Sequence, residues 1–178
     1  MRVNRISIAV VTAISILALG AILVIAQQRA SPHETVELML NGKKVSISYG
    51  RPYMKGRKVV GGTLVPYDQV WRTGADEATK LTTETDLMIG NLSVPKGSYS
   101  LFTLPSQSGW KLIVNKTADQ WGAFKYEAAQ DLGRTDMKVK ALSAPVEQFT
   151  IKLAGSGKAG TLTMQWEKTE ASIAIAAK

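Results

Sequence analysis

The side chains best suited to chemistry gather between Tyr49 and Thr79, in a stretch punctuated by Gly and Pro. Three of them are the arginines Arg51, Arg57 and Arg72. A guanidinium presents planar, paired donors that match a carboxylate or a phosphate, which a lysine ammonium does not. Because the segments between the three arginines are short and contain Gly and Pro, the loop can fold back and bring them together. The stretch 49–79 is therefore predicted to hold an anion-binding site.

The acidic side chains nearby offer a structural alternative and a catalytic one. A long loop needs stabilising contacts unless it has a function, so in the structural alternative one or two of the arginines pair with Asp76, Glu77 or Glu84 and fix the loop against the rest of the domain. Asp76 or Glu77 would also serve in acid–base chemistry with His33, the only histidine of the chain. Nothing in the spacing pairs these carboxylates with one another. Both alternatives stay open at this point.

The four tryptophans divide into two pairs. Trp110 and Trp166 lie in phase with apolar neighbours and are expected in the core. Trp71 and Trp121 lie in irregular segments, so they are the better candidates for stacking on a ligand such as a sugar. The candidate ligand-binding residues are Arg51, Arg57, Trp71, Arg72, Glu77 and His33.

Several classes of site are not supported by the residues present. The chain contains no Cys, which excludes disulfides, thiolate metal sites and a cysteine nucleophile. A lone His makes no conventional transition-metal site without help from carboxylates, so no metal is predicted. No phosphate-cradling Gly loop or serine-nucleophile motif accompanies the plentiful Ser and Thr. Neither a cofactor nor a named reaction is predicted.

The charge balance favours anionic partners. The 178 residues carry a net charge of +8, and a processed domain lacking Arg2 and Arg5 carries about +6. The cations are spread along the chain and form no known nucleic-acid-reading motif, so no nucleic acid is predicted as a partner. An anionic small molecule, a glycan or another component of the cell envelope fits better.

The first 28 residues have the composition of an export segment. Two arginines lie within Met1–Arg5, and no residue from Ile6 to Gln28 is charged. The sequence is consistent with cleavage after Ala26, but the run Ile6–Ile25 is also just long enough to span a bilayer. Residues 1–28 are therefore predicted to be an apolar helix that acts as a signal peptide or as an inner-membrane anchor, in which case the membrane is a partner. Residues 29–178 would form a single periplasmic or extracellular domain.

The rest of the chain has the pattern of short antiparallel strands. Alternating apolar residues flank Asn41-Gly42, which predicts a hairpin over roughly residues 35–50. A second hairpin is predicted around Gly90-Asn91, between Leu87–Ile89 and Leu92–Val94. Turn signals recur every eight to twelve residues, which predicts an all-β fold, an antiparallel β-sandwich of about nine or ten strands.

The less regular segments allow only coarser predictions. Pro66–Trp71 is expected to form one helical turn, and a short helix is expected near Tyr126–Leu132. Met137 and Val139 are assigned to one strand and Phe149–Leu153 to another. The apolar positions of Leu162–Trp166 and of Ile173–Ile175 mark two further strands, which complete the sandwich.

Four phrases of the sequence resemble one family of exported bacterial proteins, domain-of-unknown-function family 2911. They are SPHETV, VSISYGRPYMKGRKVVGGTLVPYDQVWRTGADEAT, PKGSYSLFTLP and GTLTMQWE, and the resemblance covers about Ser31 to Ile175. The WRTGADEAT phrase is the most specific of them. The resemblance implies an exported β-rich domain, and it implies neither an activity nor catalytic residues.

Three hypotheses follow for the function. The first is an exported, non-enzymatic binding module with an anionic ligand at the 49–79 stretch. The second is a hydrolase of envelope material that uses Glu77 or Asp76 with His33. The third is a purely structural envelope protein.

Overall fold

The computed structural model describes residues 29–178, and these residues are almost entirely β-structure. The strands are β1 (His33–Leu40), β2 (Lys43–Gly50), β3 (Thr79–Thr83), β4 (Leu87–Ile89), β5 (Leu92–Val94), β6 (Gly97–Pro105), β7 (Trp110–Asn115), β8 (Asp131–Ser156) and β9 (Ala159–Ala177). All pairings between them are antiparallel, as the sequence predicts. The predicted apolar helix of residues 1–28 lies outside the described residues.

Both predicted hairpins are confirmed. In the first, β1 and β2 pair along their whole length, from His33↔Gly50 to Leu40↔Lys43. Asn41 and Gly42 join them with φ of 52° and 74°, the left-handed backbone that a two-residue hairpin turn requires. The second hairpin, β4–β5, turns at Gly90, whose φ is 57°.

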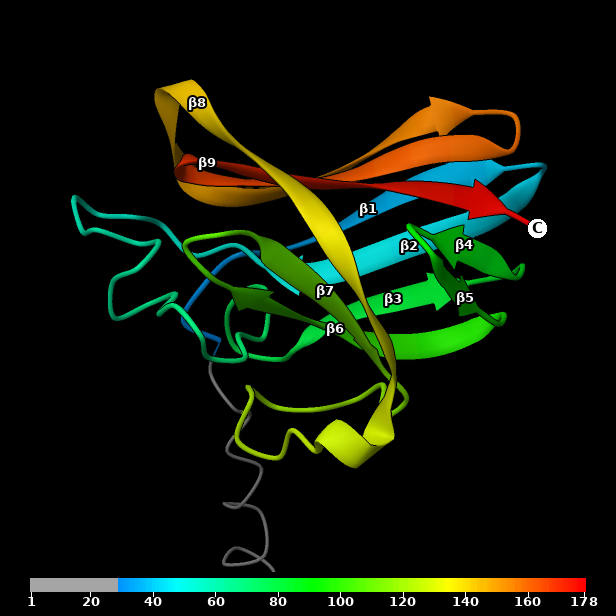
Figure 1. The fold of residues 1–178 in the computed structure, drawn as a ribbon, viewed down its shortest axis with the longest axis horizontal. Helices are drawn as coiled ribbons and strands as arrows, with labels where there is room; N and C mark the ends of the chain where they lie inside the picture. Colours follow the sequence, from blue (N-terminus) through cyan, green and yellow to red (C-terminus); the bar gives the residue numbers. More distant parts are fainter. Residues whose placement is uncertain (1–28) are drawn as a thin grey trace, which may run out of the picture.

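The nine strands form one continuous sheet in the order β1-β2-β3-β6-β7-β8-β9-β4-β5. The long strand β8 connects two parts of this sheet, because it pairs with β7 up to Met137 and with β9 from Lys138 onward. Two register shifts interrupt the β8–β9 pairing between Ala141 and Thr150. Figure 1 shows β8, in yellow to orange, crossing from the β6–β7 side of the molecule to the side of β9. The sandwich-like arrangement is thus one sheet folded over itself.

The core lies between the two parts of this folded sheet. Ile47 and Leu81 from β2 and β3 line one small internal cavity together with Leu162 and Ile175 from β9. Trp110 and Trp166 are buried, as predicted, with 6% and 4% of their surface exposed. Inward-facing residues alternate with outward-facing ones along β2 and β3. In β2 this alternation is visible in the sequence as Val45, Ile47 and Tyr49.

Two kinds of local expectation were wrong, and a third, the short helix near Tyr126–Leu132, was confirmed in part. The two strands predicted between Met137 and Leu153 are parts of one long strand, β8, and the two predicted between Leu162 and Ile175 are parts of β9. Bulges rather than turns interrupt the apolar alternation of these long strands. Residues 66–71 form turns and an isolated bridge instead of a helical turn. The short helix near Tyr126–Leu132 is a single 3-10 turn, Ala128–Gln130. Within residues 29–178, no helix has the length and apolarity needed to cross a membrane.

Candidate functional site

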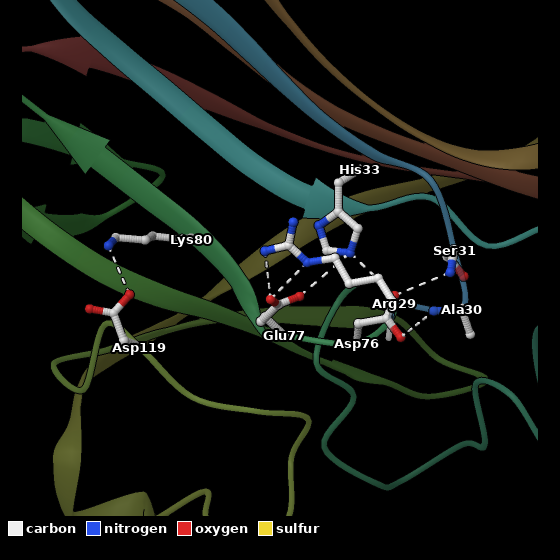
Figure 2. A network of polar contacts seen from close by, with 8 residues as sticks. All are labelled: Arg29, Ala30, Ser31, His33, Asp76, Glu77, Lys80 and Asp119. Carbon is white, nitrogen blue, oxygen red and sulfur yellow. Dashed lines mark hydrogen bonds and ion pairs between the residues drawn. The ribbon is translucent and has the colours of Figure 1, made fainter. Parts of the chain in front are cut away.

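A turn over residues 72–78 rests on the outward face of the sheet where β1 begins and β2 ends. His33 pairs there with Gly50. A side-chain carbon on Gly50 would lie 2.3 Å from the carbonyl oxygen of Ala75, so only glycine lets the turn approach this closely. The close approach brings the carboxylates of Asp76 and Glu77 to the His33 ring (Figure 2).

His33 contacts both carboxylates through one nitrogen. Its Nε2 lies 3.2 Å from Oδ2 of Asp76 and 3.5 Å from Oε2 of Glu77. Asp76 adopts a φ of 62°, a left-handed conformation that Asp tolerates better than most residues. From this position its carboxylate also accepts hydrogen bonds from the backbone amides of Ala30 and Ser31, at 3.3 and 3.2 Å. The turn therefore fastens the segment that precedes β1.

Glu77 forms the outer part of the same network. Its Oε1 accepts hydrogen bonds from Nε and Nη2 of Arg29, at 3.0 and 2.7 Å. Burial is the largest single influence on the pKa of Glu77 and acts to raise it, but the hydrogen bond from Arg29, a backbone hydrogen bond and the charges of Arg29 and His33 together lower the pKa below its usual value. Burial likewise acts to raise the pKa of Asp76, and the hydrogen bonds from His33 and two backbone amides lower it overall. Both carboxylates are therefore ionised at neutral pH.

The loop that follows β7 lies directly beside this turn. Its backbone lies antiparallel to the turn, because the Ala78 amide donates to the Gln120 carbonyl and the Gly122 amide donates to the Asp76 carbonyl, both at 2.9 Å. The loop also presents Asp119, whose Oδ1 lies 2.8 Å from Nζ of Lys80 on β3. Figure 2 shows this second ion pair on the opposite side of Glu77 from Ala30 and Ser31.

These segments, together with β1, β2 and β3, line an open cleft of about 720 Å³. We call it the His33 cleft, and its lining residues are Arg29, His33, Ser48, Tyr49, Glu77, Ala78, Lys80, Ala118, Asp119, Gln120 and Trp121. Trp121 is half-buried, so part of its indole ring remains accessible. Gln120 is buried and its Nε2 donates to Oδ1 of Asn115 and to the carbonyl of Thr117, which holds this loop in place.

The predicted arginines are not brought together as a clamp. Nη1 of Arg51 lies 2.7 Å from Oε2 of Glu34, and its other nitrogens donate to the Phe149 carbonyl and to Oγ1 of Thr150. Arg57 donates to two carbonyls of its own loop, those of Met54 and Tyr53. Both arginines contact groups of the protein itself, but not the carboxylates that the structural alternative named: Arg51 pairs with Glu34, and Arg57 donates to backbone carbonyls.

Arg72 and Trp71 also lie away from the cleft lining. Burial lowers the pKa of Arg72, the charge of Asp76 acts in the opposite direction, and its buried Nε has no hydrogen-bond partner within residues 29–178. Trp71 is buried, stacked on Trp166 at 5.9 Å and edge-on to Phe149 at 5.1 Å between ring centroids. Its ring belongs to the core in this structure, and no open face is left for a sugar.

Of the residues that the sequence brought forward, the cleft lining contains His33, Glu77 and Trp121, and Trp121 is the antiparallel bridge partner of Glu77. Asp76 contacts His33 but does not line the cleft. The cleft residues that sequence reasoning missed are Arg29, Lys80, Asp119 and Gln120. Lys80 lies at an outward position of β3, next to the buried Leu81. The others come from loops whose contacts depend on distant residues. Within the described part of the chain, no cluster of three His, Asp or Glu residues is arranged to hold a metal ion.

Comparison with known proteins identifies the chain only at the level of a family. The family model described as "Protein of unknown function (DUF2911)" matches residues 31–175. Neither a curated protein nor a solved structure matches the chain.

Proposed function

This chain belongs to the DUF2911 family, which is described as a family of unknown function, and from that premise we propose that it is an exported binding module whose ligand occupies the His33 cleft. The ligand is a small polar molecule or the end of a glycan. The cell envelope is the compartment proposed, with residues 1–28 as the export signal or anchor.

One observation supports this proposal most directly: a cleft of about 720 Å³ is lined by charged and aromatic side chains from separate parts of the chain. Its volume falls within the range of small-molecule sites, about 300–1,000 Å³. Its cations already have partners, Arg29 with Glu77 and Lys80 with Asp119. Both pairs are partly exposed, so exchanging either partner for a ligand group costs little.

A screen by thermal shift tests this proposal. The compounds are neutral sugars, acidic sugars, phosphates and carboxylates, added to the full-length chain in a mild detergent. A ligand that binds only the folded state raises the melting temperature. We expect Trp121→Ala to abolish the shift, because it removes the aromatic surface of the cleft.

The matched control is Phe124→Ala. Phe124 belongs to the same loop, is 87% exposed and does not line the cleft, so its removal should leave the shift unchanged. The proposal fails if no compound shifts the wild type. It also fails if the two variants lose the shift equally. Failure of the whole screen would favour the purely structural hypothesis.

A hydrolase is the second candidate, and the contact of His33 with Asp76 and Glu77 favours it. Hydrolysis of glycosidic bonds commonly needs one carboxyl that is protonated at working pH. Asp76 and Glu77 both have lowered pKa values, so neither is suited to that role. Release of soluble fragments from purified cell-wall material by the wild type, lost in His33→Gln while ligand shifts persist, would decide for the enzyme.

Export has its own test, mass spectrometry of the protein from its native cell fractions. A signal peptide predicts a mature chain that begins near residue 27 in the envelope fraction. An anchor predicts the full-length chain in the membrane fraction. A soluble cytosolic chain that begins at Met1 would overturn the proposed compartment.

A further inference from the structure

The outward face of the sheet beside the His33 cleft carries hydroxyl groups in register across the strands. We call this the hydroxyl face, and its residues are Thr35, Ser46, Ser48, Thr82 and Ser98. Ser46 pairs with Thr82, which in turn pairs with Ser98. Thr35 pairs with Ser48, which pairs with Lys80. Neighbouring strands lie about 4.8 Å apart, so the hydroxyls form a regular grid.

The alternation of each strand explains why these hydroxyls face solvent. On β2, Val45 and Ile47 point into the core, whereas the alternate residues Ser46 and Ser48 point outward. On β3, Leu81 is buried whereas Thr82 is exposed. The outward positions of β2 and β3 contain no large apolar side chain, and the exposed Met39 lies at the far end of β1, so the centre of this face lacks the apolar cluster of an ordinary protein–protein interface.

The hydroxyl face is continuous with the His33 cleft. Ser48 and Lys80 belong both to the cleft lining and to one cross-strand row. Thr82 lies two residues further along β3, and its Oγ1 lies 3.1 Å from Oγ of Ser98. A ligand that enters the cleft can therefore extend along β2 and β3 without meeting another wall from these strands.

We propose that the His33 cleft and the hydroxyl face together bind an extended saccharide chain. This inference rests on the proposed function and names the ligand class. A serine or threonine hydroxyl both donates and accepts a hydrogen bond, and so does each hydroxyl of a sugar. One ring stacks on Trp121 in the cleft, and the following rings lie over Ser48 and Thr82.

The charges near this path are consistent with an uncharged chain. Arg29 and Lys80 supply two cations, and both are paired with carboxylates, Glu77 and Asp119. Glu37, at the far end of the face, lies 3.5 Å from Nζ of Lys44. Because each of these charges has a partner of opposite sign, the ligand does not have to carry a charge. The hydroxyls of the hydroxyl face are neutral and can both donate hydrogen bonds to a ligand and accept them from it.

Calorimetric titration with saccharides of increasing length tests the inference. The probes are N-acetylglucosamine and its β-1,4-linked oligomers of two to six units, with the matching glucose oligomers as a second series. The full-length chain is used in a mild detergent. We expect affinity to rise with each added unit until the hydroxyl face is covered. The series that binds more tightly distinguishes an amino-sugar polymer from a plain glucan.

Two variants locate the binding path. Ser48→Ala and Thr82→Val each remove one hydroxyl with little change in shape, and each should weaken binding of the longest oligomer about 3- to 10-fold, the effect of one neutral hydrogen bond. The matched control is Thr161→Val, at an exposed position of β9 in the other part of the sheet, and it should leave binding unchanged. Thr82→Val should not alter the affinity for the monosaccharide.

The outcomes separate this inference from the proposed function. If a small ligand shifts the melting temperature through Trp121 but affinity does not rise with saccharide length, the binding module stands and the saccharide path is overturned. The same conclusion follows if Thr161→Val weakens binding as much as Thr82→Val does. If no compound binds at all, both proposals fail.

Discussion

The stretch 49–79 and the His33 cleft use their cations differently. In the stretch 49–79, Arg51 contacts Glu34, a backbone carbonyl and a threonine hydroxyl. In the His33 cleft, the cations Arg29 and Lys80 each contact one carboxylate. The two regions also differ in exposure. The side chain of Arg51 is 25% exposed, compared with 56% for Arg29. A partly buried charge with several partners is held in place by the fold. An exposed ion pair contributes little stability and can exchange a partner with a ligand.

This difference separates the residues whose replacement should unfold the protein from those whose replacement should change its binding. The sequence concentrates arginines at residues 51–72, and the structure uses Arg51 and Arg57 to fasten loops. The cleft is formed instead by residues scattered between Arg29 and Trp121. Density of charge in a sequence is therefore a poor guide to where an accessible charge will lie.

The largest effect is expected for Trp71→Ala. Trp71 is 6% exposed and packs on Trp166 and Phe149, so its truncation should lower the free energy of unfolding by about 3–5 kcal/mol. Trp121→Ala, in the cleft, should cost less than about 1 kcal/mol. Urea unfolding followed by circular dichroism measures both. Equal losses for the two tryptophans would contradict the contrast between core and cleft.

Replacing Arg51 and replacing Arg57 should also change the free energy of unfolding by different amounts, although the difference is smaller than that between the two tryptophans. Arg51→Ala leaves the Phe149 carbonyl without this donor and Glu34 without its cation, although the Tyr49 hydroxyl still donates to Glu34, so it should cost about 1–3 kcal/mol. Arg57→Ala is the matched control, because Arg57 bonds only to carbonyls of its own exposed loop, and it should cost about 0.5 kcal/mol or less. If Arg57→Ala were the more damaging, the loop would depend on contacts other than those of Arg51.

The fold was largely predictable because the strand signals are local. Asn41-Gly42 fixes a hairpin within a few residues, and the apolar alternation along β2 identifies its buried face. The bulges of β8 were not predictable in this way. They break the alternation over several residues, which mimics a turn in the sequence, and only the pairing with β9 shows that the strand continues.

The candidate site was predictable only in part. His33 and Glu77 were selected by residue type, and the turn that brings them together depends on the close approach of Gly50 to Ala75. Contacts of this kind join residues that are far apart in the sequence. The arginines were selected by density alone, and no local signal distinguishes Arg51, which faces Glu34, from an arginine that faces solvent.

Asp76 should make the stability of the fold depend on pH. Its pKa is lowered in the folded state, so its contribution is present above the unfolded value of about 3.9 and is lost as pH falls through the folded value. Asp76→Asn keeps a residue that tolerates the left-handed backbone and removes the charge. We expect a loss of about 1–2 kcal/mol at pH 6. The difference from wild type should shrink as pH falls toward 3, and a constant difference in urea unfolding would rule out this role.

Only a small effect on stability is expected for Arg72, although the sequence places it among the most prominent candidates. Burial lowers its pKa and only Asp76 opposes this, so the guanidinium is poorly compensated within residues 29–178. Arg72→Met keeps the apolar stem and removes the charge, which relieves desolvation while it loses the attraction to Asp76. The two effects oppose each other, and the free energy of unfolding should change by less than about 1 kcal/mol. A loss as large as that of Arg51→Ala would place Arg72 with the arginines that fasten the fold. An unchanged stability, combined with a loss of the thermal shift caused by acidic ligands, would instead restore Arg72 as an anion-binding residue and extend the ligand site beyond the His33 cleft.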